Sequence, residues 1–155
     1  MRKRISPLIA VLIATASMGA AAQQAPKPEQ QIKWRQSVYQ VLAWNQARIK
    51  ANVEGTFNKE DVIRAANSTA AIANSGLGAL YGPGTETGKG WRDTTVKPEL
   101  FTDAKGVGEA AANFTREANE LARVAATGDA VAVKAQFGKV GQSCKGCHDD
   151  YRKKD

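Results

Sequence analysis

The sequence predicts an all-α protein, an antiparallel up-down-up-down four-helix bundle. Apolar residues recur at intervals of three and four in four separate segments, which is the periodicity of amphipathic helices. Residues typical of helix starts and ends flank these segments, and no alternating apolar and polar run typical of a strand is present. The first and third connections are short, so consecutive helices are expected to form antiparallel hairpins.

The first 22 residues have the pattern of a secretory signal peptide. Residues 2–4 are basic, residues 5–14 are mostly apolar, and small residues occupy positions 20–22. The apolar stretch is short and is followed by Thr15 and Ser17, which disfavours the alternative of an uncleaved membrane anchor. We therefore expect cleavage after Ala22, export to the periplasm, no membrane insertion afterwards, and one domain over residues 23–155.

The first predicted helix covers residues 28–53. Pro28 suits the first helical position, Glu29 suits the first turn, and Gly55 is expected to end the helix. Its inward face steps by threes and fours through Ile32, Arg35, Tyr39, Leu42, Gln46, Ile49 and Val53.

The second predicted helix begins after Asn58, a favourable N-cap with Asp61 three residues later. Its inward face is expected to continue to the turn at residues 81–85, although two glycines weaken its end. This face consists of Val62, Ile63, Ala66, Ala70, Ala73, Leu77 and Leu80. A long polar loop over residues 82–102 follows, and loops of this length in small domains are commonly functional.

The third predicted helix begins at residue 102 or 103 and ends at residue 127. Its inward face is Val107, Ala110, Ala111, Phe114, Ala118, Leu121 and Ala125. Gly128 is expected to end it, and Asp129 to cap the fourth helix. The inward face of the fourth helix is Val133, Phe137, Val140, Cys144, Cys147 and Tyr151.

Residues 144–148 read Cys-Lys-Gly-Cys-His and contain both cysteines and the only histidine of the chain. The C-x-x-C-H pattern is typical of c-type haem attachment, in which two thiols form thioethers and the imidazole coordinates iron. On a helix, Cys144, Cys147 and His148 share one face. We therefore expect one covalent haem c near the C-terminus, with thioethers at both cysteines and His148 as the axial iron ligand.

Other C-x-x-C chemistries fit this motif less well. A redox-active pair usually begins a helix in a βαβ unit, and no strand pattern precedes these residues. A structural zinc site needs about four ligands, whereas the chain has three Cys and His residues in total. A plain disulfide would leave His148 unexplained.

The two methionines, Met1 and Met18, both lie in the predicted leader. After cleavage, neither a methionine nor a second histidine remains as a sixth iron ligand, so we expect a five-coordinate or weakly capped iron. Loss of three leader cations lowers the formal net charge from +7 to +4. No basic run is interleaved with aromatics, so nucleic acid is not an expected partner.

The chain resembles the cytochrome c′ family of four-helix c-type cytochromes over nearly all of residues 23–155. The resemblance rests on four segments in order: residues 33–37, 81–86, 98–101 and 144–152. It implies a high-spin, five-coordinate haem that binds NO and CO, usually in a homodimer. For that dimer, Trp34 and Val38 are the candidate surface residues.

The resemblance also implies roles for individual residues. Arg35 would lie near a haem propionate, with a snorkelling surface arginine as the alternative. Tyr39 would cover the vacant distal face, with ordinary core packing as the alternative. Arg152 would flank the proximal imidazole, and it also suits a cation that complements the helix dipole. Phe137, two turns before the motif, is expected to wall the haem.

The predicted function is periplasmic binding of NO and CO, for sequestration or sensing, together with electron transfer. The alternative is a primary electron carrier of a respiratory or photosynthetic chain, with an unidentified periplasmic redox partner. A peroxidase-like enzyme is disfavoured because O–O cleavage needs a distal acid–base group and the chain has no second histidine. We therefore expect a protein that is not an enzyme.

Overall fold

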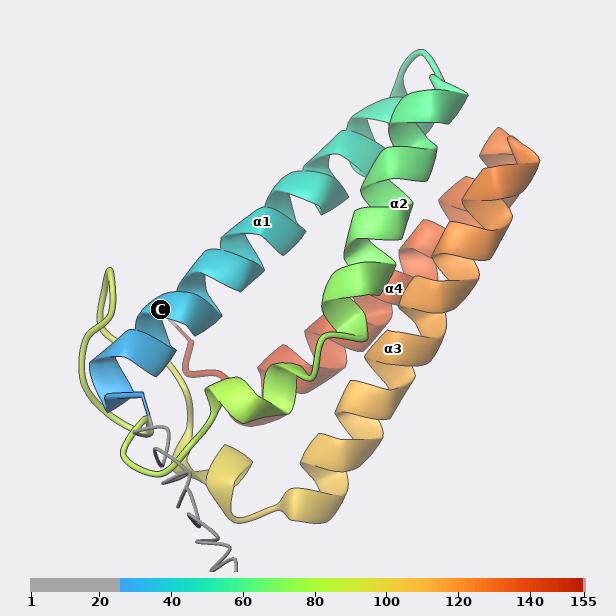
Figure 1. Cartoon of the computed structure of the whole chain (residues 1–155). Helices are drawn as coiled ribbons and strands as arrows, with labels where there is room; N and C mark the ends of the chain where they lie inside the picture. The colour runs from blue at the N-terminus through green and yellow to red at the C-terminus, as the bar shows by residue number, and fades with distance from the viewer. Residues whose placement is uncertain (1–25, 155) are drawn as a thin grey trace, which may run out of the picture.

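Four helices dominate the computed structural model, which describes residues 26–154 (Figure 1). They are α1 (Pro28–Glu54), α2 (Lys59–Ala73), α3 (Ala104–Thr127) and α4 (Ala130–Tyr151), and each runs antiparallel to the helix before it. This arrangement confirms the predicted up-down-up-down bundle. The predicted signal peptide, residues 1–22, lies outside the described residues. No helix within residues 26–154 is long and apolar enough to cross a membrane.

The helix ends follow the local chemistry that the sequence predicts. Pro28 occupies the first turn of α1, and Gly128 ends α3 with a left-handed φ of 79°. The side chains that cap α2, α3 and α4 each accept a hydrogen bond from a first-turn backbone N–H; they are Asn58, Asp103 and Asp129. Local capping therefore fixes where three of the helices begin.

The second helix is shorter than predicted, because α2 ends at Ala73 and not near Leu80. The backbone N–H and the side-chain amide of Asn74 both donate to the Ala70 carbonyl, at 3.0 and 2.7 Å. Gly76 then adopts a φ of 79°, which turns the chain out of the helix direction. The following residues form a separate 3₁₀ helix, η1 (Leu77–Leu80). The predicted placement of Leu77 and Leu80 on the second helix is therefore wrong.

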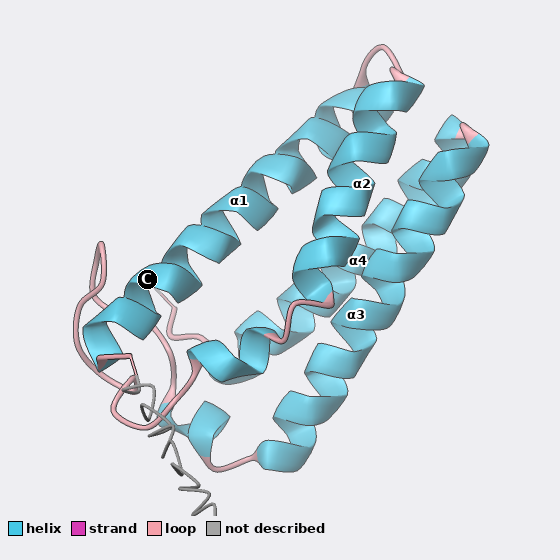
Figure 2. Ribbon diagram, viewed as in Figure 1, coloured by secondary structure: helices cyan, strands magenta, loops and turns pink. Residues whose placement is uncertain are grey.

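The long connection between η1 and α3 has little regular structure except for a second 3₁₀ helix, η2 (Pro98–Phe101) (Figure 2). It wraps around the end of the bundle where α1 begins and α4 ends (Figure 1). An isolated β-bridge pairs Val96 with Arg152 beside this end. The predicted polar loop is thus part of the same end of the molecule as residues 144–148.

The apolar core lies toward the opposite end, where short turns join α1 to α2 and α3 to α4. Its buried members are Ile49, Val62, Ala65, Ala66, Leu121, Val124, Ala125, Val133 and Val140. Among the neighbouring helix pairs, α1 and α4 approach each other at the fewest places. The predicted faces differ from the structure in several details; for example, Ala111 is exposed, and the polar Asn45 is fully buried on α1.

Replacing Leu121 by Ala should lower the free energy of unfolding by about 2–5 kcal/mol, because Leu121 is fully buried in the core and a cavity would remain. Val131, which is 81% exposed, provides the control, and Val131→Ala should change stability by at most about 0.5 kcal/mol. Denaturant unfolding followed by circular dichroism measures both. Equal losses in the two variants would contradict this placement of the core.

Candidate haem site

The C-x-x-C-H residues lie in the last turns of α4. Cys144 and Cys147 are free, half-buried thiols, whereas His148 is exposed. Burial raises the pKa of both thiols. Partial burial of the imidazole ring, followed by the nearby charge of Arg152, lowers the pKa of His148. At neutral pH the imidazole is therefore neutral and suited to bind a metal ion.

Tyr39 approaches the same region from α1. Its hydroxyl oxygen accepts a hydrogen bond from the Tyr81 hydroxyl at 3.1 Å. Burial raises the pKa of Tyr39, and ionised Cys147 and Cys144 would raise it further. The Tyr39 phenol therefore lies within electrostatic range of both thiols, although α1 and α4 pack sparsely against each other.

Arg35, one turn before Tyr39, is a buried cation with only 3% of its surface exposed. Its guanidinium donates to Leu80 O at 3.2 Å and to Thr85 at both Oγ1 and O, at 3.2 and 3.1 Å. A fourth bond reaches Thr94 Oγ1 at 2.8 Å. Burial lowers the pKa of Arg35, yet a guanidinium stays charged at neutral pH. The alternative of a snorkelling surface arginine is therefore wrong.

The loop over residues 82–102 is fastened to α1 and to the end of α4. The Trp91 backbone N–H donates to Gln36 Oε1 at 2.7 Å, and its indole N–H donates to Ser37 Oγ at 2.9 Å. At the other side, Lys97 N donates to Tyr151 O at 2.9 Å. The Lys97 ammonium also donates to two carbonyls of the last turn of α4. The loop thereby bridges the two helices that bear Tyr39 and the cysteines.

Phe137 lies in the first half of α4, and Arg152 directly follows the helix. Phe137 is half-buried and packs against the apolar core, two turns before Cys144. The backbone N–H of Arg152 donates to His148 O at 3.1 Å, and its charge acts on the imidazole. Arg152 and His148 share a surface depression of about 270 Å³ with Asp149, Lys153 and Lys154.

Tyr81 also belongs to this site, although no local sequence pattern predicts a role for it. It follows η1, so helical periodicity gives no information on its direction. Its ring lies under the guanidinium of Arg35, with Cζ 4.5 Å from the ring centroid. Burial raises the pKa of Tyr81 well above the normal range. The Gly-Pro-Gly turn directly after it is the available signal of a constrained backbone here.

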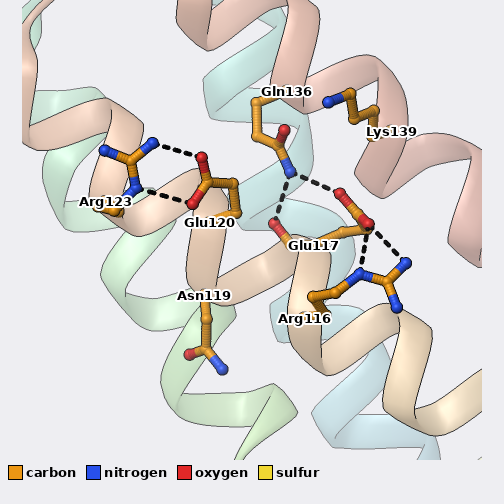
Figure 3. Close-up of a pocket in the computed structure, with 7 residues that line it drawn as sticks. All are labelled: Arg116, Glu117, Asn119, Glu120, Arg123, Gln136 and Lys139. Atoms are coloured by element: carbon orange, nitrogen blue, oxygen red, sulfur yellow. Dashed lines mark hydrogen bonds and ion pairs between the residues drawn. The ribbon is translucent and has the colours of Figure 1, made fainter.

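A larger hollow of about 500 Å³ lies between α3 and α4 (Figure 3). Several of its polar groups bind one another: Glu117 accepts from Gln136 Nε2 at 2.8 Å and from Arg116. Glu120 likewise pairs with Arg123. No cluster of metal-ligating side chains is present among residues 26–154. Both carboxylates of this hollow are therefore already paired within the protein.

The end of α4 fits a covalently attached haem on several independent grounds. Two free thiols and an adjacent imidazole share the helix surface, which is the donor set of c-type attachment. Most buried core residues lie toward the other end, with Cys144 packed against their edge, and α1 and α4 pack sparsely. A large apolar cofactor would supply the contacts that side chains do not.

Comparison with known proteins gives a consistent result. The family model for "Cytochrome C'" matches residues 30–152. A cytochrome c′ from Rhodocyclus tenuis is 68% identical over 130 residues, covering 83% of this chain and 98% of the relative.

Two solved structures are also similar to this chain. One, described as a cytochrome c′ with an unusual ligand-controlled dimer dissociation, is 54% identical with a TM-score of 0.81. The other is a nitric oxide complex of a cytochrome c′ mutant from Alcaligenes xylosoxidans, 31% identical with a TM-score of 0.74. Each similarity covers 83% of this chain and 98% of the other chain.

Replacing Arg35 by Leu should lower the free energy of unfolding by about 2–4 kcal/mol, since buried acceptors on the loop would lose their donors. The loosened loop should also be cut faster by trypsin at Lys89 or Arg92. Arg116→Leu removes an exposed arginine and its surface ion pair, and should cost at most about 1 kcal/mol. Denaturant unfolding and limited proteolysis measure the difference; similar behaviour of the two variants would refute this role of Arg35.

Proposed function

Because this chain belongs to the cytochrome c′ family and carries haem c, we propose that it is a periplasmic protein that binds nitric oxide and carbon monoxide at a high-spin, five-coordinate haem. One observation carries the proposal. Residues 26–154 contain no methionine, and His148 is their only histidine. The two usual protein ligands for a sixth iron position are therefore absent from this part of the chain.

Each residue of the site would have a distinct task. Cys144 and Cys147 would hold the haem by thioether bonds, and His148 would bind the iron. The haem supplies, when bound, an iron centre that takes up diatomic gases and exchanges one electron. Tyr39 would cover the face opposite His148, and Phe137 would contact the haem edge on the α4 side.

The two arginines would act mainly through charge. Arg35 already donates to Leu80, Thr85 and Thr94, so its remaining effect on a propionate is long-range attraction at this end of the bundle. Arg152 would act on the side of the imidazole, in line with its effect on the pKa of His148.

The protonation state of Tyr39 supports the five-coordinate state. Burial raises the pKa of Tyr39, so its hydroxyl is a neutral phenol at pH 7. Tyrosine binds haem iron strongly as the phenolate, which burial disfavours here. Tyr39 would therefore restrict access to the iron without occupying it.

Binding of NO is further supported by the NO complex of the relative from Alcaligenes xylosoxidans. The second candidate function is electron transfer to a periplasmic partner. The exposure of His148 favours it, because a haem bound there would lie close to the protein surface. The two functions are compatible. Peroxidase-like catalysis has no support, because the site lacks a histidine to serve as distal acid–base group.

We further propose a homodimer that forms through the outer face of α1. Trp34, Val41 and Trp44 are 45%, 48% and 59% exposed on this helix, and Trp91 adjoins them through its bond to Ser37. Exposed aromatic side chains at this density are typical of an interface. The similar structure with ligand-controlled dimer dissociation supports a dimer.

The ferrous protein should bind CO and NO reversibly, with absorption spectra typical of five-coordinate haem before ligand is added. His148→Ala should keep the haem covalently attached but change the spectrum, because the axial ligand is removed while the thioethers remain. Lys145→Ala, on the same helix and exposed, should leave the spectrum unchanged. A low-spin, six-coordinate spectrum without added ligand would refute the proposal.

Val41→Glu should weaken the dimer at least about tenfold, since it would bury an unpaired carboxylate from each protomer in the proposed interface. Val131→Glu is the matched control, because Val131 is also exposed but lies at the start of α4. Sedimentation velocity over a concentration series measures both variants. Unchanged association of Val41→Glu, or equal weakening by Val131→Glu, would rule out this interface.

A further inference from the structure

A hydrogen-bonded pair of tyrosines stands beside the proposed gas-binding side of the haem. The Tyr81 hydroxyl donates to the Tyr39 hydroxyl at 3.1 Å, although the two residues are separated by 42 positions in the chain. We propose that Tyr81 is a positioning residue, whose hydroxyl holds Tyr39 over the iron and so opposes the entry of a gas ligand. This inference rests on the proposed function, which places Tyr39 over that face.

Tyr81 is suited to be the fixed member of the pair. Its ring lies 4.5 Å from the guanidinium carbon of Arg35 and 6.4 Å, between centroids, from the ring of Phe101. Arg35 itself is fixed by four hydrogen bonds to residues 80–94. A ring held from two sides in this way presents its hydroxyl at a defined place.

Tyr39 is the member that has to move. Within residues 26–154, Tyr81 is the hydrogen-bond partner of the Tyr39 hydroxyl. Burial raises the pKa of both tyrosines, so both hydroxyls are neutral and the bond persists across the physiological pH range. A ligand that needs the space under Tyr39 has to displace its ring, and this breaks the bond in partly buried surroundings.

The hydrogen bond therefore opposes ligand binding by a definable amount. A net contribution typical of one neutral hydrogen bond corresponds to about a two- to tenfold change in an equilibrium constant. Because Phe keeps the ring and its packing, Tyr81→Phe removes this contribution alone. The position of Tyr81 next to Arg35 and Phe101 should be retained in that variant.

The test compares wild-type ferrous holoprotein with Tyr81→Phe, Tyr39→Phe and the double variant by stopped-flow CO binding at pH 7. Tyr81→Phe should raise CO affinity about two- to tenfold, mainly through faster association. Tyr39→Phe should have a similar effect, and the double variant should add little, because the two singles remove the same bond.

A second measurement monitors the hydrogen bond between Tyr81 and Tyr39 directly. Ultraviolet resonance Raman bands of tyrosine report hydrogen bonding of the phenol, and CO should shift them in the wild type but not in Tyr81→Phe. Tyr151→Phe is the control: the Tyr151 hydroxyl donates to Asp103 Oδ2 at 2.6 Å, not to Tyr39. That variant should lose stability and keep wild-type CO binding, which distinguishes positioning from a general loss of a tyrosine hydroxyl.

Different results would contradict the role of Tyr81 and the proposed binding of gases. CO affinity in Tyr81→Phe that is unchanged or lower than that of the wild type overturns the role of Tyr81. Additive effects in the double variant overturn it as well. A wild-type protein that binds no CO overturns the proposed function instead, whatever the variants do.

Discussion

The loose pairing of α1 with α4 is the constraint on which the rest of the structure depends. The other neighbouring helices pack closely around small core residues, whereas α1 and α4 approach each other at few places. The same two helices bear Tyr39 and the Cys144–Cys147 pair. A haem attached to α4 would therefore provide the apolar contacts that complete this side of the bundle, and so couple cofactor binding to stability.

Polar side chains organise the end of the bundle where α1 begins and α4 ends. Arg35 binds the loop through three acceptor residues, and Lys97 binds the last carbonyls of α4. Hydrogen bonds of this kind have direction, whereas apolar packing has little, so they fix loop and side-chain positions. The guanidinium of Arg35 lies over the Tyr81 ring and so helps to fix its position. The proposed gas-binding side of the haem would thus be shaped by contacts of residues outside the C-x-x-C-H motif.

The sequence predicts those features that depend on local chemistry. Asn58 and Asp129 cap helices as expected, and the three-four spacing locates most of the buried faces. The end of α2 is missed, because the apolar spacing continues to Leu80 although Gly76 turns the chain first. Tyr81 and the ties of the loop to α1 and α4 are missed for a different reason. They depend on contacts between residues more than 40 positions apart, which no local pattern encodes.

The central claim is that the protein binds the haem iron through one histidine and leaves the opposite side free. A crystal structure of the ferrous holoprotein at neutral pH tests it most directly. The account predicts a porphyrin bound between α1 and α4, with His148 on the iron and Tyr39 over the other face without an iron bond. A protein side chain bound to the iron opposite His148, or a haem located away from α1, would contradict it.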